Sequence, residues 1–189
     1  MTVARQLSKI IMLFLVYRPS YHLPAVDVPD ISLFYSYDSV IWTVKTTMET
    51  DNICKVDYVN KTTTQYAQFR RVSYSGKTRS EEDLNGTFIK MDNLRKSSTD
   101  NGMLVHTLEA GIEVSTEELM REYNNYTCGI FVVHLSSMAS GAYYYELRVK
   151  NMSIHKPRSS CDDEYRSITK YINTTQLYTE ACQTKRQHR

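Results

Sequence analysis

Two oppositely charged residues, Glu146 and Arg148, stand two positions apart in the alternating run Tyr143–Asn151. If this run is a strand, both side chains point to the same face, because the side chains of a strand alternate between its two faces. A carboxylate on a buried face must be paired, and a nearby guanidinium can supply a charge-assisted hydrogen bond. We therefore expect an internally neutralised pair, with an ordinary pair that has no ligand role as the alternative.

No motif for catalysis occurs. The sequence has no glycine-rich phosphate loop, no Gly-x-Ser-x-Gly elbow and no His-Glu-x-x-His helix. Its histidines lie scattered, without metal-ligand spacing, at His22, His106, His134, His155 and His188. We expect no enzyme, no catalytic residue, no metal and no cofactor, and the net charge of +2 predicts no nucleic-acid partner.

The N-terminal residues 1–25 are typical of a signal peptide. Arg5 and Lys9 precede the apolar run Ile10–Val16, which is too short to span a bilayer. Behind such a segment, four cysteines without a Cys-x-x-Cys pair indicate two disulfides, and three pairings are formally open. The sequence thus predicts a secreted protein without a membrane span.

Alternation of apolar and polar residues predicts about eight strands. They are expected at 42–48, 55–60, 66–74, 84–91, 103–110, 113–123, 127–135 and 143–151. The stretch Glu117–Leu119 also suits a helix. A short helix from Asp30, with Leu33 and Tyr37 on one face, is expected to cover one end, and a second helix is expected near Ser160, which acidic residues follow.

Strands in meander spacing predict an all-β fold, an eight-stranded antiparallel up-and-down barrel, because closure removes exposed strand edges. At 189 residues and 41% hydrophobic content, one monomeric domain is expected at 26–182, followed by a basic tail at 183–189. The interior of such a barrel has room for side chains or one small ligand.

This order of cysteines and strands resembles that of the tick salivary lipocalins, the family that includes the histamine-binding proteins. The matching segments are Val44–Thr47, Cys128–Ile130, Glu146–Arg148 and Cys161. The resemblance implies the lipocalin barrel, and it pairs Cys54 with Cys182 and Cys128 with Cys161.

Two positions depart from the amine-binding pattern of that family. The pattern has an acid after the first cysteine, where this chain has Gly129, and an aromatic residue after Glu-Leu, where it has Arg148. The resemblance implies that the two acids hold a protonated amine, so we expect this lower amine site to be lost. The expected ligand is then an amphipathic lipid, a sterol such as cholesterol or an eicosanoid such as a leukotriene, as in the japanin-like and leukotriene-binding members.

The predicted pocket wall combines aromatic, aliphatic and charged residues of the strands. Its members are Trp42, Val44, Asp51, Tyr58, Tyr66, Phe69, Ile130, Val132, Tyr144, Glu146 and Arg148. Two other functions stay open beside a salivary lipid binder that modulates host immune or inflammatory responses. One is a scavenger of histamine or serotonin, held by acids such as Asp38 or Asp51. The other is a barrel whose exterior binds a host immune protein or a cell-surface receptor.

Asn-x-Ser/Thr sequons predict N-glycosylation on the outside of the barrel. They lie at Asn60, Asn85, Asn125, Asn151 and Asn173. Such glycans fit the secretory route.

Overall fold

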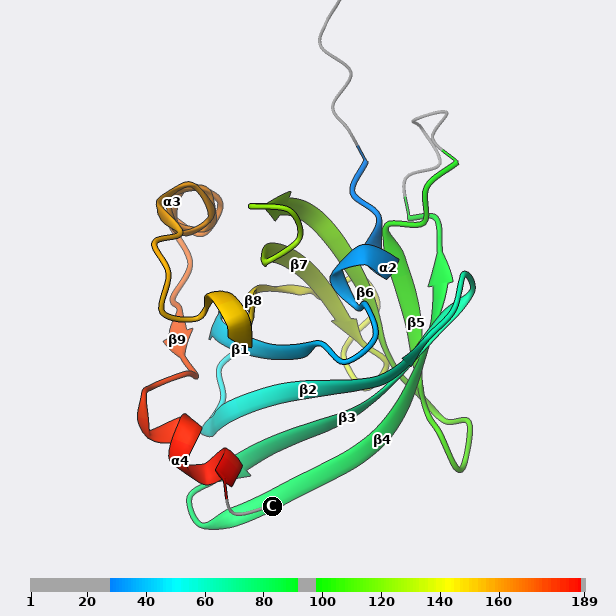
Figure 1. Ribbon diagram of the computed structural model, residues 1–189, viewed down its shortest axis with the longest axis horizontal. Coiled ribbons are helices and arrows are strands. Elements are labelled where there is room, and N and C mark those ends of the chain that lie inside the picture. The colour runs from blue at the N-terminus through cyan, green and yellow to red at the C-terminus, as the bar shows by residue number, and fades with distance from the viewer. Residues whose placement is uncertain (1–27, 92–97, 188–189) are drawn as a thin grey trace, which may run out of the picture.

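The computed structural model describes residues 28–91 and 98–187, and its strands close into one antiparallel barrel (Figure 1). The strands are β1 (Val40–Thr46), β2 (Asn52–Thr62), β3 (Tyr66–Ser75), β4 (Thr78–Ile89), β5 (Gly102–Thr107), β6 (Glu113–Tyr123), β7 (Cys128–Leu135) and β8 (Tyr144–Lys150). Each strand pairs with the next in the chain, and β1 pairs with both β2 and β8. The predicted eight-stranded up-and-down barrel is confirmed.

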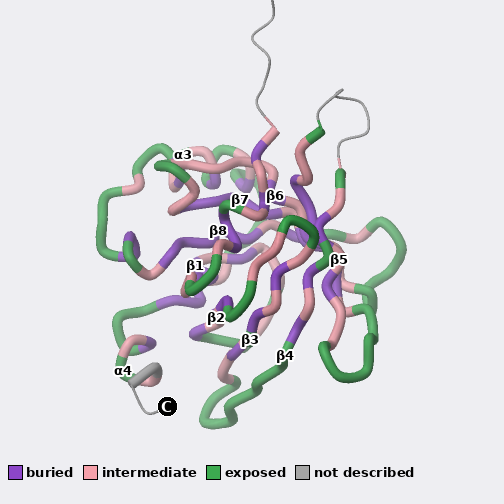
Figure 2. Tube along the Cα trace, turned by 45° about the vertical axis from the view of Figure 1, so that its right-hand side comes forward, coloured by how far each residue is buried: buried purple, intermediate pink, exposed green. Residues whose placement is uncertain are grey.

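The longest departure from the predicted strands is in β4, which begins at Thr78 instead of near residue 84. Gly76, with φ at 61°, and Lys77 form a two-residue turn, so Thr78 pairs directly with Ser75. The added residues 78–83 are exposed and polar (Figure 2), which hid them from the alternation pattern. The ambiguous stretch Glu117–Leu119 lies within strand β6.

Helix α2 (Ile31–Phe34) lies at one end of the barrel (Figure 1). It begins at Asp30 as predicted, because the Asp30 carboxylate accepts a hydrogen bond from the free backbone N–H of Ser32. Its position at one end of the barrel was also expected.

The buried face of α2 is not the one expected. Leu33 and Tyr37 are exposed, whereas Ile31, Phe34 and the following Tyr35 are buried. The helix ends after one turn, so Tyr37 lies beyond it and cannot share a helical face with Leu33.

Inside the barrel, apolar side chains from α2 and the strands form one core. It contains Ile31, Phe34, Tyr35, Ile41, Val59, Ala67, Phe69, Leu84, Phe88, Met103, Val105, Leu119, Phe131, Val133 and Tyr144. Aromatic rings dominate the end next to α2, where Phe34 packs edge-on against Phe131 at 5.1 Å between centroids. We call this α2 end of the barrel the closed half.

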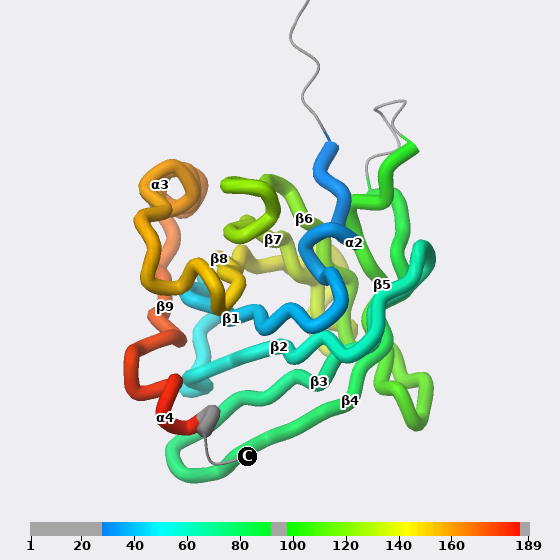
Figure 3. Tube along the Cα trace, in the orientation of Figure 1, coloured from blue at the N-terminus to red at the C-terminus, as the bar shows by residue number. Residues whose placement is uncertain are grey.

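A second apolar layer lies outside the barrel. The C-terminal segment folds into α3 (Ser159–Ile168), β9 (Thr175–Gln176) and α4 (Ala181–Gln187), preceded by the 3-10 helix η1 (Asn151–Ser153). This segment runs along the side of the barrel at β1, with which β9 pairs (Figure 3). No helix of the described residues is long and apolar enough to cross a membrane.

Both disulfides hold this outer segment against the strands. Cys54 of β2 bonds to Cys182 of α4, and Cys128 of β7 bonds to Cys161 of α3. The pairing that the family resemblance implied is therefore present. Helix α3 was expected, but β9 and α4 were not, and the basic segment expected as a tail from residue 183 begins inside α4. The predicted signal peptide lies outside the described residues.

Candidate functional site

Six charged side chains meet in the middle of the barrel. The bases are Lys55 of β2, Arg71 of β3 and Arg148 of β8, and the acids are Asp57 of β2, Glu117 of β6 and Glu146 of β8. Their neighbours Val56, Val72 and Leu147 belong to the outer layer, because alternate residues of a strand face opposite sides. With three groups of each sign, the cluster is electrically balanced, and we call it the ion network.

Arg148 is fully buried at the centre of the ion network. Its Nε donates to Glu146 Oε2 at 2.7 Å, so the predicted Glu146–Arg148 pair is confirmed. Its Nη1 donates to Glu117 and, at 2.6 Å, to the Tyr35 hydroxyl. The guanidinium also stacks over the ring of Phe131, with 4.3 Å from Cζ to the centroid.

Arg71 and Lys55 complete the network on the side away from Arg148. Arg71 binds Asp57 through two hydrogen bonds of 2.8 Å, a bidentate geometry that fixes both groups, and it also reaches Glu117 at 2.8 Å. Lys55 Nζ donates to Glu146 Oε1 at 2.7 Å. Glu146 therefore binds two cations of the protein itself, where an amine ligand would otherwise supply one.

Burial and charge set the protonation of this network. Burial opposes the ionisation of Glu117, but the guanidinium groups of Arg148 and Arg71 outweigh it and hold the pKa of Glu117 well below its ordinary value. The pKa of Glu146 is lowered in the same way by Lys55 and Arg148 against the effect of burial. Both carboxyl groups are therefore ionised at neutral pH.

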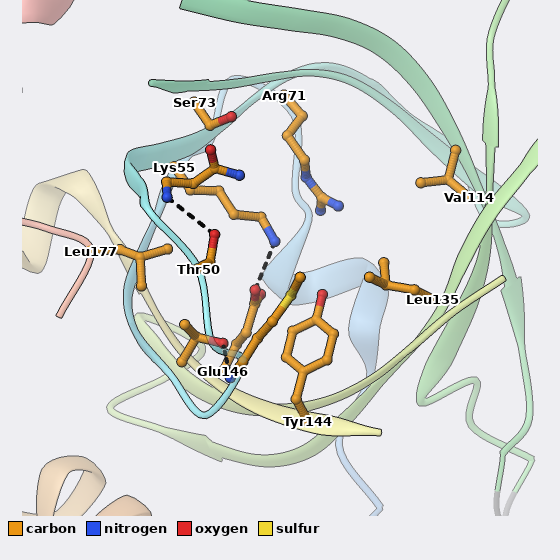
Figure 4. A pocket seen from close by; sticks show the side chains of 12 residues that line it. Thr50, Lys55, Arg71, Ser73, Val114, Leu135, Tyr144, Glu146 and Leu177 are labelled. Atoms are coloured by element: carbon orange, nitrogen blue, oxygen red, sulfur yellow. Dashed lines mark hydrogen bonds and ion pairs between the residues drawn. The ribbon is translucent and has the colours of Figure 1, made fainter. Parts of the chain in front are cut away.

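A cavity of about 190 Å³ lies above the ion network, at the end of the barrel away from α2. Strands β1, β3 and β7 end at this side of the barrel, and β2, β6 and β8 begin there. Figure 4 shows Lys55 and Arg71 on one wall and Glu146 on the opposite wall, with its carboxylate pointing to the Lys55 amine. The lining consists of Thr46, Met48, Thr50, Asn52, Lys55, Arg71, Ser73, Val114, Leu135, Tyr144, Glu146 and Leu177. We call this end the open half.

The charged groups are layered toward this cavity. Lys55 and Arg71 are 14% and 13% exposed, whereas the side chain of Glu146 is 2% exposed. The side chains of Glu117 and Asp57 are 0% and 4% exposed, and neither residue lines the cavity. Although the ion network is neutral in total, the part that a ligand meets is therefore mainly positive.

Among the described residues, the closed half is tightly filled at Gly129. A Cβ atom placed on Gly129 would lie 2.8 Å from Phe34 Cε2, 2.9 Å from Leu119 Cδ1 and 3.1 Å from Phe131 Cε2. These separations are shorter than packed carbon atoms tolerate. The space that a side chain at position 129 would occupy is thus filled by Phe34 of α2 and Phe131 of β7. An acid introduced at this position would have to displace these rings.

The structure brings only part of the predicted pocket wall together. Phe69, Tyr144, Glu146 and Arg148 face the interior, and of these Tyr144 and Glu146 line the cavity. Trp42, Val44 and Ile130 lie instead in the outer layer, with Tyr165 and Tyr178 among their neighbours. For example, the Trp42 and Tyr178 rings are 5.1 Å apart.

The remaining predicted wall residues also lie away from the cavity. Tyr58 packs against the outer layer, Tyr66 and Val132 are half-buried neighbours of the interior residues Ala67 and Phe131, and Asp51 is exposed in the loop after β1. Alternation shows which residues share a face of a strand, but it does not show which face is inside. The C-terminal segment also buries the outer face of these strands, so apolar residues occur on both faces and do not identify the inner one.

Both acids proposed for an alternative amine site are exposed. Asp38, with φ at 63°, follows α2 near the closed half, and Asp51 does not line the cavity. The functional residues that sequence reasoning missed are Lys55, Asp57, Arg71 and Glu117. Lys55 and Asp57 carry the same signal as Glu146 and Arg148, because each pair has opposite charges two positions apart on one strand.

The sequons differ in accessibility. Asn60, Asn125 and Asn173 are exposed, and Asn85 is half-buried. Asn151 is half-buried, and its Oδ1 accepts hydrogen bonds from Trp42 Nε1 at 2.8 Å and from Gln183 Nε2 at 2.9 Å. A glycan at Asn151 would disturb these hydrogen bonds, which join β1 to α4. The other four sequon asparagines do not take part in this junction.

Comparison with solved structures finds the same barrel in lipocalins. The serotonin complex of AM182 matches with a TM-score of 0.60 and 15% identity, covering 82% of this chain and 94% of that one. Japanin from Rhipicephalus appendiculatus, bound to cholesterol, matches with a TM-score of 0.55 and 8% identity over 82% and 100%. The siderocalin Ex-FABP matches with a TM-score of 0.54 and 10% identity over 76% and 94%.

Comparison with models of protein families gives no match, and neither does comparison with curated protein sequences. At these identities the structural likeness shows the fold. The chain has the lipocalin barrel fold, which is the fold that the resemblance to the tick salivary lipocalins implied.

Proposed function

We propose that this protein is a secreted tick salivary lipocalin that binds one small amphipathic ligand with an anionic head in the open half of its barrel. The head lies against Lys55 and Arg71, and the apolar part lies along Met48, Leu135 and the mouth of the cavity. Fatty carboxylates and eicosanoids have this chemistry. Sequestering such a mediator would modulate the inflammatory response of the host, as the family resemblance implies.

The observation that carries the proposal is the order of charges toward the cavity. Two partly exposed bases stand in front of acids that are more deeply buried, so an entering anion meets Lys55 and Arg71 first. Each base keeps its acid partner while a carboxylate binds, because a lysine ammonium has three donors and a guanidinium five. Apolar walls above them add burial at about 25 cal/mol per Å².

Cavity size favours a flexible chain over a sterol. The volume of about 190 Å³ is small beside the roughly 300–1,000 Å³ of sites that enclose drug-sized ligands. An acyl chain can place its head and first carbons inside and leave through the mouth. A rigid four-ring nucleus cannot be divided in this way, and its single hydroxyl makes little use of two cations.

The pairing of Glu146 argues against a biogenic amine. Lys55 Nζ already stands at 2.7 Å from Glu146, and Arg148 binds the same carboxylate. A ligand ammonium would have to displace Lys55 and leave it unpaired in a partly buried site, at a cost of a few kcal/mol. We therefore expect histamine and serotonin to bind weakly or not at all in this cavity.

Calorimetric titration of delipidated protein tests the proposal. Arachidonate should bind one to one, and its methyl ester, which lacks the charge, should bind about 10- to 100-fold more weakly, because a charge-assisted contact contributes about 1.5–3 kcal/mol. Lys55→Gln should weaken arachidonate binding by a similar factor, and Lys61→Gln, an exposed site on the same strand, should not. Equal affinity for acid and ester, or tight serotonin binding that Glu146→Gln abolishes, would overturn it.

A further inference from the structure

We infer that the Lys55 amine is a covalent capture site for small apolar aldehydes, which it binds as a reversible imine. The inference rests on the cavity of the proposed function, but it concerns a reactive, uncharged ligand class. An aldehyde offers an apolar body to the cavity walls and an electrophilic carbon to the amine at the cavity floor.

The geometry around Lys55 has the parts that imine formation needs. Figure 4 shows its amine at the cavity with Glu146 beside it and the Tyr144 hydroxyl nearby. Its hydrogen-bond partner is the Glu146 carboxylate at 2.7 Å, and its side chain is 14% exposed. Val114, Leu135 and Leu177 line the same cavity and can cover an alkyl chain.

The reaction balances with water as the proton carrier. Lys55 first releases a proton to water at the mouth of the cavity, and the free amine attacks the aldehyde carbon, forming the C–N bond and a carbinolamine. A proton returns from water to the carbinolamine, whose hydroxyl leaves as water to give a protonated imine beside the ionised Glu146. The net change is one ammonium and one aldehyde to one iminium and one water, so the positive charge opposite Glu146 is kept and the ion network stays balanced.

The surroundings support each step. Burial lowers the pKa of Lys55, and the neighbouring Glu146 carboxylate offsets this only in part, so the free amine is easier to reach than on an exposed lysine. Burial raises the pKa of Tyr144, which keeps its hydroxyl protonated and able to donate a hydrogen bond to the carbonyl oxygen. Both effects favour a nucleophilic amine in an apolar site.

Reductive trapping tests the inference. The folded protein is incubated with hexanal and cyanoborohydride, which reduces an imine to a stable secondary amine, and peptide mass mapping locates the alkylated lysines. Lys55 should be alkylated roughly tenfold faster than the exposed Lys61, Lys77 and Lys156, because a lowered pKa increases the fraction of free amine at neutral pH. Lys55→Arg, which keeps the cation beside Glu146, should lose this fast site, and alkylation of Lys55 no faster than that of Lys61 would overturn the inference.

Competition with arachidonate separates this inference from the proposed function. Saturating arachidonate should protect Lys55 from hexanal and leave Lys61 unprotected. If calorimetry shows arachidonate binding but Lys55 is not alkylated selectively, the imine site is refuted while the proposed function stands. If Lys55 is alkylated selectively but arachidonate neither binds nor protects, the imine site stands and the proposed function is refuted.

Discussion

The two halves of the barrel interior are built from the same strands but are filled in opposite ways. In the closed half, Phe34 and Tyr35 enter from α2 and pack against Phe69 and Phe131. In the open half, no helix of the described residues enters, and the space above Lys55 is a cavity of about 190 Å³. The difference teaches that one short segment, α2 with Tyr35, decides which half of this barrel is filled.

The ion network lies between these halves and contributes side chains to both. Toward the closed half, Arg148 lies on the Phe131 ring and binds the Tyr35 hydroxyl, so it belongs to the aromatic packing. Toward the open half, Lys55 and Arg71 form the cavity floor. A buried charge is tolerated only when it is paired, and each acid of the network has at least one base within 2.8 Å.

The largest effect is expected from the bond that holds the outer wall of the open half. Cys54–Cys182 closes a loop with a sequence separation of 128, and Cys54 N donates to the carbonyl of Leu177, a cavity residue. Cys54→Ser/Cys182→Ser should lower the free energy of unfolding by about 5 kcal/mol, less any strain in the native bond. Urea unfolding measures this change, and an unchanged free energy of unfolding would contradict it.

Removing one base from the ion network should lower the free energy of unfolding by nearly as much. Arg148→Met leaves Glu117 without its closest base and Glu146 with Lys55 alone, and removing one partner of a buried pair typically costs about 3–5 kcal/mol. Arg70→Met is the matched control, because Arg70 pairs with Asp83 on the exposed face of the barrel and should cost less than about 1 kcal/mol. Equal losses in the two variants, measured by urea unfolding, would show that the interior network has no special role.

Substitution by alanine should distinguish the closed half from the open one. Gly129→Ala forces a Cβ against Phe34 and Leu119, and such overpacking costs about 1–3 kcal/mol. Ser73→Ala at the cavity should change stability by less than about 0.5 kcal/mol. If thermal unfolding gives the same small change for both variants, the closed half is less tightly filled than its geometry indicates.

The smallest effect concerns Lys150, which donates from Nζ to the Leu33 carbonyl and the Ser36 hydroxyl at the end of α2. Burial lowers the pKa of Lys150 to about 8, below its unfolded value near 10.4. Between these values the unfolded chain binds more protons, so the free energy of unfolding should rise with pH, by at most about 1 kcal/mol per unit. In Lys150→Met this contribution to the rise should be absent, and parallel pH profiles of the two proteins would contradict it.

Sequence patterns predicted the barrel because strand alternation and turns are local, and the resemblance to a family supplied the cysteine pairing. They predicted the Glu146–Arg148 pair for the same reason, since both residues belong to one strand. They did not predict the ion network, because Lys55, Arg71 and Glu117 meet only after the barrel closes. They also placed Trp42 and Ile130 on the wrong face, since a buried outer layer gives exterior positions the same apolar character as interior ones.

The most direct test of the account is a crystal structure of the delipidated protein soaked with a long-chain carboxylate brominated at its tail. The carboxylate should lie against Lys55 and Arg71, and the anomalous signal of bromine should appear at the mouth of the cavity near Leu135. Bromine beside Phe34 and Phe131 in the closed half, or bound only on the outer surface of the barrel, would contradict the division of the interior into a filled half and a binding half.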